Sequence, residues 1–447
     1  MKQTSFIESE PMEVENHSQT GMLRTLCYSL LYILSFHYVY VAYINPTFEY
    51  AHYTYLTFSN TALICTYLIA LAPILAYKPT SEPAQAIAAM IYALSYVPTQ
   101  LSLLFTINID YFELLQVQIL LALSMSILFY IARAGVQQRP FFIQFEFMDR
   151  LVTFATIISL IALIATNIDH MRIVSFEDVY DLRFEAAAAS TSTIVGYMIS
   201  WLSYCFLPYL YARGIIEKKW TYILIGLLCS ILLYMATGSK ASILLLPIII
   251  GLSWLWGSGE NFLPKLLFTM ALTFAALIHL IPDDGLGMWS KSIIFVRVVG
   301  SSGWVASKYY EFFNAEGLTY YSHIGIINSL TNSYSYGDLS LGQVIGLEYS
   351  GSSEANFNAS FWASDGFAAL GPLGVLVITP FLAGLLYSIN IVMGKFDSKL
   401  STIWLTGFYI ALLNVPLSTA LFSGGGLLIL LQALTIAQEC EVDTRKP

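Results

Sequence analysis

Long apolar runs are the feature that most constrains how this chain folds. They recur along most of its length, and many reach or approach the roughly 20 residues that a helix needs to cross a bilayer. Of the 447 residues, 57% are hydrophobic and 11% are charged, whereas soluble domains have about 25% charged residues. Because every backbone polar group in lipid needs an internal partner, such runs form helices. The sequence therefore predicts an all-α fold, a polytopic membrane bundle of about twelve transmembrane helices.

The Lys and Arg positions predict the orientation of this bundle. The predicted spans lie near residues 25–45, 56–77, 84–105, 114–132, 150–168, 191–212, 220–237, 241–257, 264–281, 366–393, 401–419 and 421–437. With both termini in the cytoplasm, the outer side holds only six of the twenty Lys and Arg residues, namely Arg172, Arg183, Lys240, Lys291, Arg297 and Lys308. The excess of positive charge inside favours this orientation. It gives a disordered cytoplasmic tail (1–22), one transmembrane domain (23–437) and a cytoplasmic C-terminal tail (438–447).

Two of the predicted external loops are long, residues 169–190 and residues 283–358. The second has no apolar run of membrane length and is rich in tyrosine. Polar backbone requires water or a shell of folded protein. We therefore expect the functional site to include this loop, on the periplasmic side if the host is Gram-negative.

Three of the outer cations are candidates for binding phosphate. Arg183 lies in the first long loop, Lys240 follows Gly238 and Ser239 at a junction between two spans, and Arg297 lies near the start of the second loop. An arginine fork pairs with two phosphate oxygens, and a lysine acts as a point charge. Backbone N–H groups at the start of a helix could face the same anion. The alternative is that each cation pairs locally or reaches to lipid headgroups.

His323 is the candidate general base. It lies in the run GLTYYSHIGIINSL, outside the predicted spans. A neutral imidazole can take a proton from a hydroxyl group. An ordinary loop histidine is the alternative. The neighbouring Tyr320 and Tyr321 belong to an aromatic set that would suit sugar rings, although tyrosines also anchor proteins at lipid headgroups.

A third candidate segment reads EANFNASFWASDGFAALGPLG, from Glu354 to Gly374. It carries Asn356, Asn358 and Asp365 just before a predicted span. An ionisable residue at the entry to a membrane suggests function. Helix capping by Asn or Asp is the alternative.

Other chemistries have no sequence support. The chain contains no phosphate-binding P-loop, no dinucleotide fingerprint and no nucleophile elbow. No His, Cys, Asp or Glu cluster has metal-ligand spacing, so we expect neither a metal nor another cofactor. The net charge of −9 and the lack of a basic tract argue against nucleic-acid binding.

The chain resembles the O-antigen polymerases of the Wzy type. The resemblance covers roughly residues 170–435 and is carried by the layout of spans and loops together with three segments. These are TGSKASILLLPIII at Thr237 to Ile250, YYSH at Tyr320 to His323, and ANFNASFWASDGFAALGPLG at Ala355 to Gly374. Some members have an Arg and a Gly at a fixed spacing in both loops. Here Arg183 precedes Gly196 and Arg297 precedes Gly300, so the two spacings differ.

The resemblance implies a metal-independent membrane glycosyltransferase in the bacterial inner membrane. It would transfer a growing glycan from undecaprenyl diphosphate to the non-reducing end of a new lipid-linked repeat unit, building O-antigen or a similar polysaccharide. Arg183, Lys240 and Arg297 would hold the diphosphate, and His323 would be the base. Tyr320, Tyr321, Asn356, Asn358 and Asp365 would lie near the sugars. A chain-length regulator protein is a potential partner.

Two other functions remain open. An O-antigen ligase would use the same leaving group but transfer finished glycan to another lipid. A flippase or transporter of lipid-linked oligosaccharides would need polar residues in the inner halves of the spans and an internal repeat. The sequence has few buried charges and no repeat, which favours an enzyme.

Overall fold

The structure is a computed structural model that describes residues 10–135, 147–174, 193–257, 259–358 and 362–436. Within these ranges it is helical and contains no β-strand, which confirms the all-α prediction. Helix α1 begins at Glu10 and therefore extends into the predicted N-terminal tail.

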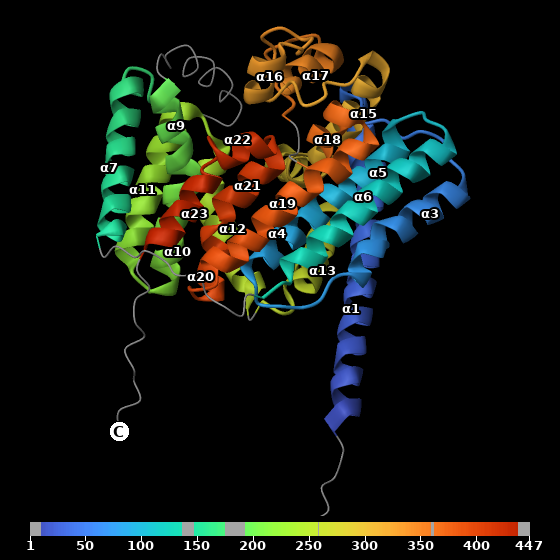
Figure 1. Ribbon diagram of the computed structural model, residues 1–447, viewed down its shortest axis with the longest axis horizontal. Helices are drawn as coiled ribbons and strands as arrows, with labels where there is room; N and C mark the ends of the chain where they lie inside the picture. Colours follow the sequence, from blue (N-terminus) through green and yellow to red (C-terminus); the bar gives the residue numbers. More distant parts are fainter. Residues whose placement is uncertain (1–9, 136–146, 175–192, 258, 359–361, 437–447) are drawn as a thin grey trace, which may run out of the picture.

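The elements of the first half of the chain pack side by side in the bundle of Figure 1. They are α1 (Glu10–Val39), η1 (Tyr40–Ile44), α2 (Asn45–Phe48), η2 (Glu49–Ala51), α3 (Asn60–Leu71), η3 (Ala72–Leu75), α4 (Pro83–Ile91), η4 (Tyr92–Tyr96), α5 (Val97–Thr106), α6 (Tyr111–Ala132), α7 (Met148–Asn167), α9 (Thr193–Trp201), η5 (Leu202–Phe206) and α10 (Leu207–Ile216).

The second half contributes further membrane-length helices and the polar segment between them. Its elements are α11 (Trp220–Thr237), α12 (Lys240–Trp256), α13 (Phe262–Leu280), α14 (Gly285–Lys291), η6 (Ser292–Gly300), α15 (Ser301–Glu316), α16 (Gly325–Thr331), α17 (Leu341–Ser350), α18 (Ala363–Leu370), α19 (Pro372–Met393), α20 (Ser398–Trp404), α21 (Thr406–Asn414), α22 (Leu417–Leu421) and α23 (Gly426–Thr435).

Nine helical segments in the described ranges are long and apolar enough to cross a membrane. They are Gly21–Ala51, Pro83–Thr106, Tyr111–Ala132, Arg150–Asn167, Thr193–Ile216, Trp220–Thr237, Phe262–Leu280, Pro372–Met393 and Leu417–Thr435. Two shorter apolar helices, Asn60–Leu75 and Lys240–Trp256, accompany them. The chain is thus a multi-pass membrane protein, although the count of twelve is not confirmed. The predicted span 401–419 is divided among α20, α21 and α22.

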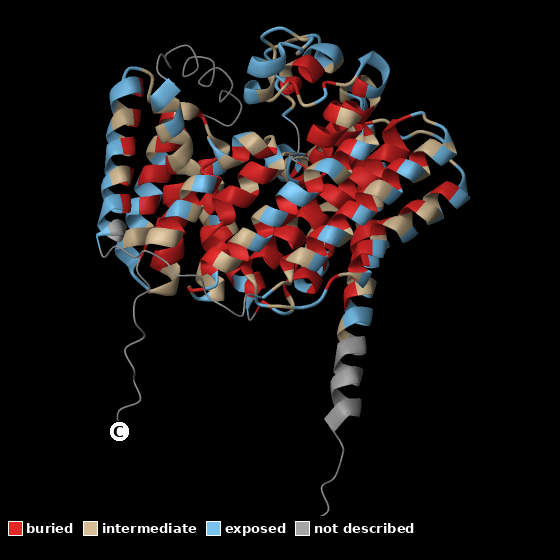
Figure 2. Ribbon diagram, viewed as in Figure 1, coloured by how far each residue is buried: buried red, intermediate tan, exposed pale blue. Residues whose placement is uncertain are grey.

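The surface of the bundle is apolar where lipid would cover it. Helix α7 exposes Leu151, Phe154, Ile157 and Ile161, each by 46% or more of its surface. In Figure 2 the buried residues lie in the middle of the bundle, while α7 at its edge is mostly pale blue or tan. Contiguous apolar surface of this kind is rare on soluble monomers, so it supports the membrane assignment.

The polar segment 283–358, predicted as a loop, is largely helical. Its first part is a continuous helix from Gly285 to Glu316, formed by α14, η6 and α15. α15 packs against α5 and α18, and its side chains from Ser302 to Tyr310 are buried. Gly303 permits this packing because a Cβ there would lie 2.4 Å from the carbonyl oxygen of Pro98. The remainder, residues 317–358 with α16 and α17, lies over one end of the bundle in Figure 1; we call it the cap.

A tight turn separates α18 from α19, within the single span predicted at 366–393. Gly371 has a φ of +62°, a conformation that favours glycine. The turn brings Gly366 and Gly374 together so closely that a Cβ on Gly374 would lie 2.1 Å from the Gly366 carbonyl oxygen. The glycines of the run GFAALGPLG thus allow two helices to pack backbone against backbone.

Gly374→Ala is expected to lower the free energy of unfolding by about 2 kcal/mol or more, because overpacking forces the two backbones apart. Gly384 is the matched control, since it lies in the same helix and a Cβ added to it would meet no atom within 4 Å. Gly384→Ala should be neutral or slightly stabilising. Thermal denaturation in detergent measures both variants, and equal melting temperatures would contradict the close packing.

Candidate functional site

Asp365 is a buried carboxylate in the first turn of α18, with 4% of its surface exposed. Its Oδ2 accepts a hydrogen bond of 3.1 Å from the backbone N–H of Leu417, the first residue of α22. Its Oδ1 has no hydrogen-bond partner among the described residues. Asp365 therefore caps a helix, the alternative that the sequence left open, and also presents an unsatisfied oxygen inside the protein. Such an oxygen is costly to bury.

His323 faces that oxygen. Its Nε2 lies 3.8 Å from Asp365 Oδ1, and both side chains are almost fully buried. The preceding turn docks on the end of α18, where the backbone N–H groups of Thr319 and Tyr320 donate to the carbonyls of Ala368 and Ala369. These carbonyls belong to the last turn of α18, which lacks partners within its own helix. The docking thus fixes His323 over Asp365, and we call these two residues the His323–Asp365 pair.

The turn itself is strained. Tyr320 and Tyr321 have φ values of 49° and 61°, in the left-handed region that bulky residues seldom adopt. Strain of this kind persists only when the surrounding contacts hold it. Tyr321 is held by a 3.2 Å hydrogen bond from its hydroxyl to the carbonyl of Gly374, and its ring packs on His323. Tyr320 instead points outward and is 68% exposed.

Hydrogen bonds around Thr319 assign the proton of the imidazole. The Thr319 hydroxyl donates to the carbonyl of Ala368 at 3.0 Å and lies 2.9 Å from His323 Nδ1. A hydroxyl has one proton, so with that proton on Ala368 it accepts from Nδ1–H. Nε2 then carries a lone pair toward Asp365 Oδ1. Two acceptors facing each other in a buried space require a proton, a water molecule or a hydroxyl group between them.

Burial decides where such a proton resides. Desolvation raises the pKa of Asp365 to about 7, against a smaller opposing contribution from the Leu417 N–H. Desolvation also lowers the pKa of His323 to about 4. Near pH 6 the pair therefore holds one proton, on the carboxyl group. Above about pH 7 it loses that proton and can accept one from a substrate hydroxyl.

Lys240 and Arg297 lie on other elements than the pair. The Lys240 ammonium is 4.9 Å from the centre of the Trp289 ring, which joins α12 to α14. Arg297 is exposed on η6 and is close enough to Tyr53 to lower its pKa, although burial dominates and raises it overall. Among the described residues, neither cation contacts the His323–Asp365 pair. Arg183 lies outside the described residues.

Two other outer cations, which the sequence did not single out as candidates, have a structural role. Lys291 is buried and its ammonium lies 2.6 Å from Asp283 Oδ1. Lys308 is buried on α15, where it pairs with Glu311 Oε2 at 2.6 Å. Buried charges need such partners because desolvation is costly.

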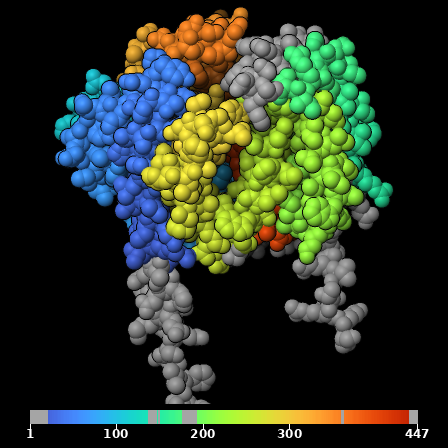
Figure 3. All heavy atoms as spheres, turned by 180° about the vertical axis from the view of Figure 1, so that it is seen from behind, coloured from blue at the N-terminus to red at the C-terminus, as the bar shows by residue number. Residues whose placement is uncertain are grey.

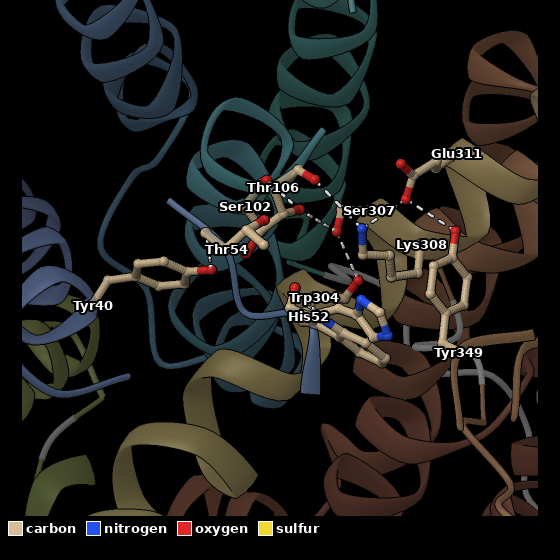
Figure 4. A network of polar contacts seen from close by, with 10 residues as sticks. All are labelled: Tyr40, His52, Thr54, Ser102, Thr106, Trp304, Ser307, Lys308, Glu311 and Tyr349. Carbon is tan, nitrogen blue, oxygen red and sulfur yellow. Dashed lines mark hydrogen bonds and ion pairs between the residues drawn. The ribbon is translucent and has the colours of Figure 1, made fainter. Parts of the chain in front are cut away.

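Lys308 also ties the cap to the bundle, as Figure 4 shows. Its ammonium lies 3.4 Å from the carbonyl of Thr106 on α5 and 5.1 Å from the centre of the Tyr349 ring on α17. The Tyr349 hydroxyl donates to Glu311 at 2.9 Å. This network was not predicted from the sequence, although the i, i+3 spacing of Lys308 and Glu311 signals a pair.

Asn356 and Asn358, the remaining predicted residues, belong to the cap. Both are exposed and lie against Gly342 on α17. Of the aromatic residues in segment 283–358, Trp304, Tyr309 and Tyr310 are buried in the core, whereas Tyr320 is on the surface. Within the described residues, no group of three or more His, Cys, Asp or Glu side chains is arranged to hold a metal ion.

A hollow opens on the side of the molecule seen in Figure 3. It lies between the yellow segment, which runs from α13 to η6, and the green segment, which includes α11 and α12. The Lys240–Trp289 contact joins elements from these two walls. A molecule anchored in the bilayer could enter such a hollow from the side.

Comparison with known proteins gives no match to a protein family, to a curated protein or to a solved structure.

Proposed function

We propose that the protein is a membrane glycosyltransferase that polymerises lipid-linked oligosaccharides, with the His323–Asp365 pair as the acceptor of the substrate proton. The observation that carries the proposal is the unsatisfied Asp365 Oδ1, buried 3.8 Å from His323 Nε2. Capping of α22 accounts for Asp365 Oδ2 and leaves Oδ1 without a hydrogen bond among the described residues. A buried proton-accepting pair is useful when a hydroxyl group must be deprotonated as it attacks.

The reaction needs three elements. A hydroxyl of the acceptor sugar attacks the anomeric carbon of the donor and passes its proton to the pair. The bond from that carbon to the diphosphate oxygen breaks as the new glycosidic bond forms. The undecaprenyl diphosphate leaves with developing negative charge, which cations fixed in advance would stabilise.

Lys240 and Arg297 are the cations proposed for this role. Lys240 stands at the first residue of α12, where the helix dipole adds positive potential. The hollow of Figure 3 offers a lateral entry for a lipid-anchored donor. The resemblance to the Wzy-type polymerases of the bacterial inner membrane supports the same substrate class. Under this proposal the cap lies in the periplasm and both termini lie in the cytoplasm.

Lys240→Ala and Arg297→Ala are each expected to lower chain extension by about 10²-fold, the usual effect of removing one preorganised charge stabiliser. The variants are produced in a strain lacking the chromosomal gene, and the polysaccharide is resolved by gel electrophoresis. Lys78→Ala is the control, because Lys78 is an exposed cation on the predicted cytoplasmic side.

The gel also distinguishes a polymerase from a ligase. Loss of a polymerase leaves single repeat units attached to the acceptor lipid, whereas loss of a ligase leaves no attached glycan. Long chains persisting in both variants at normal expression would remove the two cations from the mechanism. Absence of any glycan change in a complete deletion would refute the proposed function.

A further inference from the structure

Helices α1 and α13 pack along each other with aromatic pairs at successive heights. Tyr28 lies 4.8 Å from Phe268 and Tyr32 lies 5.9 Å from Phe274, measured between ring centres. At the upper end the Tyr38 ring stacks on the His279 imidazole at 5.8 Å and 25°. Residue numbers rise together along both helices, so the two run parallel.

Small side chains between the upper two pairs leave a groove. Ser35 on α1 and Ala275 on α13 are too short to meet, and the space between them measures about 210 Å³. Its floor is apolar and closed, because Val39 and Phe274 are each only 1% exposed. Its outer rim is open, because Leu34 is 45% and Tyr38 is 50% exposed.

The groove lies at a defined depth in the membrane. His279 lies seventeen residues after Phe262, the first residue of its span, or about 26 Å of helix. Tyr38 lies at the same height, because its ring stacks on the His279 imidazole. The hydrocarbon core is about 30 Å thick. The apolar groove thus opens to the lipid tails, and the polar edges of Tyr38 and His279 lie near the headgroups on the side of the cap.

We propose that this groove binds one acyl chain of a zwitterionic phospholipid from the cap-side leaflet. The phenol and imidazole at its upper end supply hydrogen-bond donors for the phosphate. Exposed Asp284, five residues after His279, supplies an acceptor for an ammonium headgroup. A straight chain suits a narrow space between two aromatic pairs better than a methyl-branched polyprenyl chain does.

The test replaces Ala275 with Phe, which fills the groove from a lipid-facing position. The protein is reconstituted with equal amounts of phosphatidylethanolamine and phosphatidylglycerol, extracted in mild detergent and weighed by native mass spectrometry. We expect the natural chain to retain one phosphatidylethanolamine and Ala275→Phe to lower its occupancy at least about 10-fold, one decade of affinity. Leu272→Phe is the matched control, because Leu272 is a 53% exposed residue of the same helix outside the groove.

Equal retention by the natural chain and by Ala275→Phe would overturn the proposal, as would preferential retention of phosphatidylglycerol or of an added polyprenyl phosphate. Melting temperatures of both variants show whether they fold. The readout is lipid mass, so it does not depend on the proposed glycosyl transfer.

Discussion

Asp365→Asn is expected to reduce chain extension by about 10² to 10⁴-fold, the usual contribution of a positioned acid or base. The amide has the same shape, and its oxygen can still accept the Leu417 N–H that caps α22. It cannot take up a proton near neutral pH. The measurement is the glycan length distribution in a strain that lacks the chromosomal gene, with membrane levels of the variant determined in parallel.

Asp397→Asn provides a closely matched control. Asp397 also caps a helix, accepting the N–H of Leu400 at 2.9 Å, but it is exposed. This variant should make full-length glycan. His323→Gln should show a loss similar to that of Asp365→Asn, because the proposed base is the pair. Full-length glycan from a folded Asp365→Asn protein would exclude the carboxyl group from proton transfer.

The second large effect concerns stability against pH. The pKa of Asp365 is raised from 3.8 to about 7, so its folded state holds a proton that the unfolded state has lost between pH 4 and pH 7. Considered alone, the raised pKa of Asp365 contributes stability that is fully present below pH 4. This contribution is lost as the pH rises through about 7. The pKa of His323 is lowered from 6.5 to about 4. Considered alone, the lowered pKa of His323 contributes stability that is fully present above pH 6.5. This contribution is lost as the pH falls through about 4.

The two effects cancel in the natural chain between about pH 4 and pH 6.5. Folding moves one proton from the histidine to the aspartate, so the pair binds the same number of protons in both states and adds no pH dependence to stability. Removing one partner leaves the pH dependence of the other uncompensated. In His323→Gln, stability should fall as the pH rises from 4 to 7, by up to about 4 kcal/mol at 1.36 kcal/mol per pKa unit. In Asp365→Asn it should fall as the pH drops from 6.5 to 4, by up to about 3 kcal/mol.

Melting temperatures in detergent at several pH values between 4 and 8 test these opposite slopes. The double variant, which carries both His323→Gln and Asp365→Asn, is the control, because it holds neither titrating group and should show neither slope. If both single variants kept the profile of the natural chain, the proton would not be shared as described.

Several features of the site depend on contacts that no sequence pattern encodes. The sequence identified His323 and Asp365 separately, as a base and as a sugar-binding or capping residue. The two are 42 residues apart in the chain, and they pair because the turn at Thr319 and Tyr320 docks on the last carbonyls of α18. Thr319 itself was not singled out, since a lone threonine in a loop carries no signal. The phosphate-binding roles of Lys240 and Arg297 stay predictions.

The polar segment 283–358 illustrates the same limit. Its composition indicated that it was not an ordinary span, and none of the nine apolar spans of the described residues lies within it. The hydropathy could not show that Gly285 to Glu316 is one helix packed on α5 and α18. A helix whose polar groups are satisfied by neighbours, such as Lys308 by Glu311 and Thr106, has the composition of a loop. Burial of polar residues depends on partners distant in the chain.

The sequence by itself determined the fold class, because apolar runs of membrane length leave a chain no stable alternative to helices in lipid. Tertiary structure alone decided which polar residues meet. The spacing of apolar residues is a local property, readable along the chain, whereas the 3.8 Å approach of His323 to Asp365 results from packing among α15, α18, α22 and the start of the cap. Such packing depends on shape and hydrogen bonding between segments far apart in sequence.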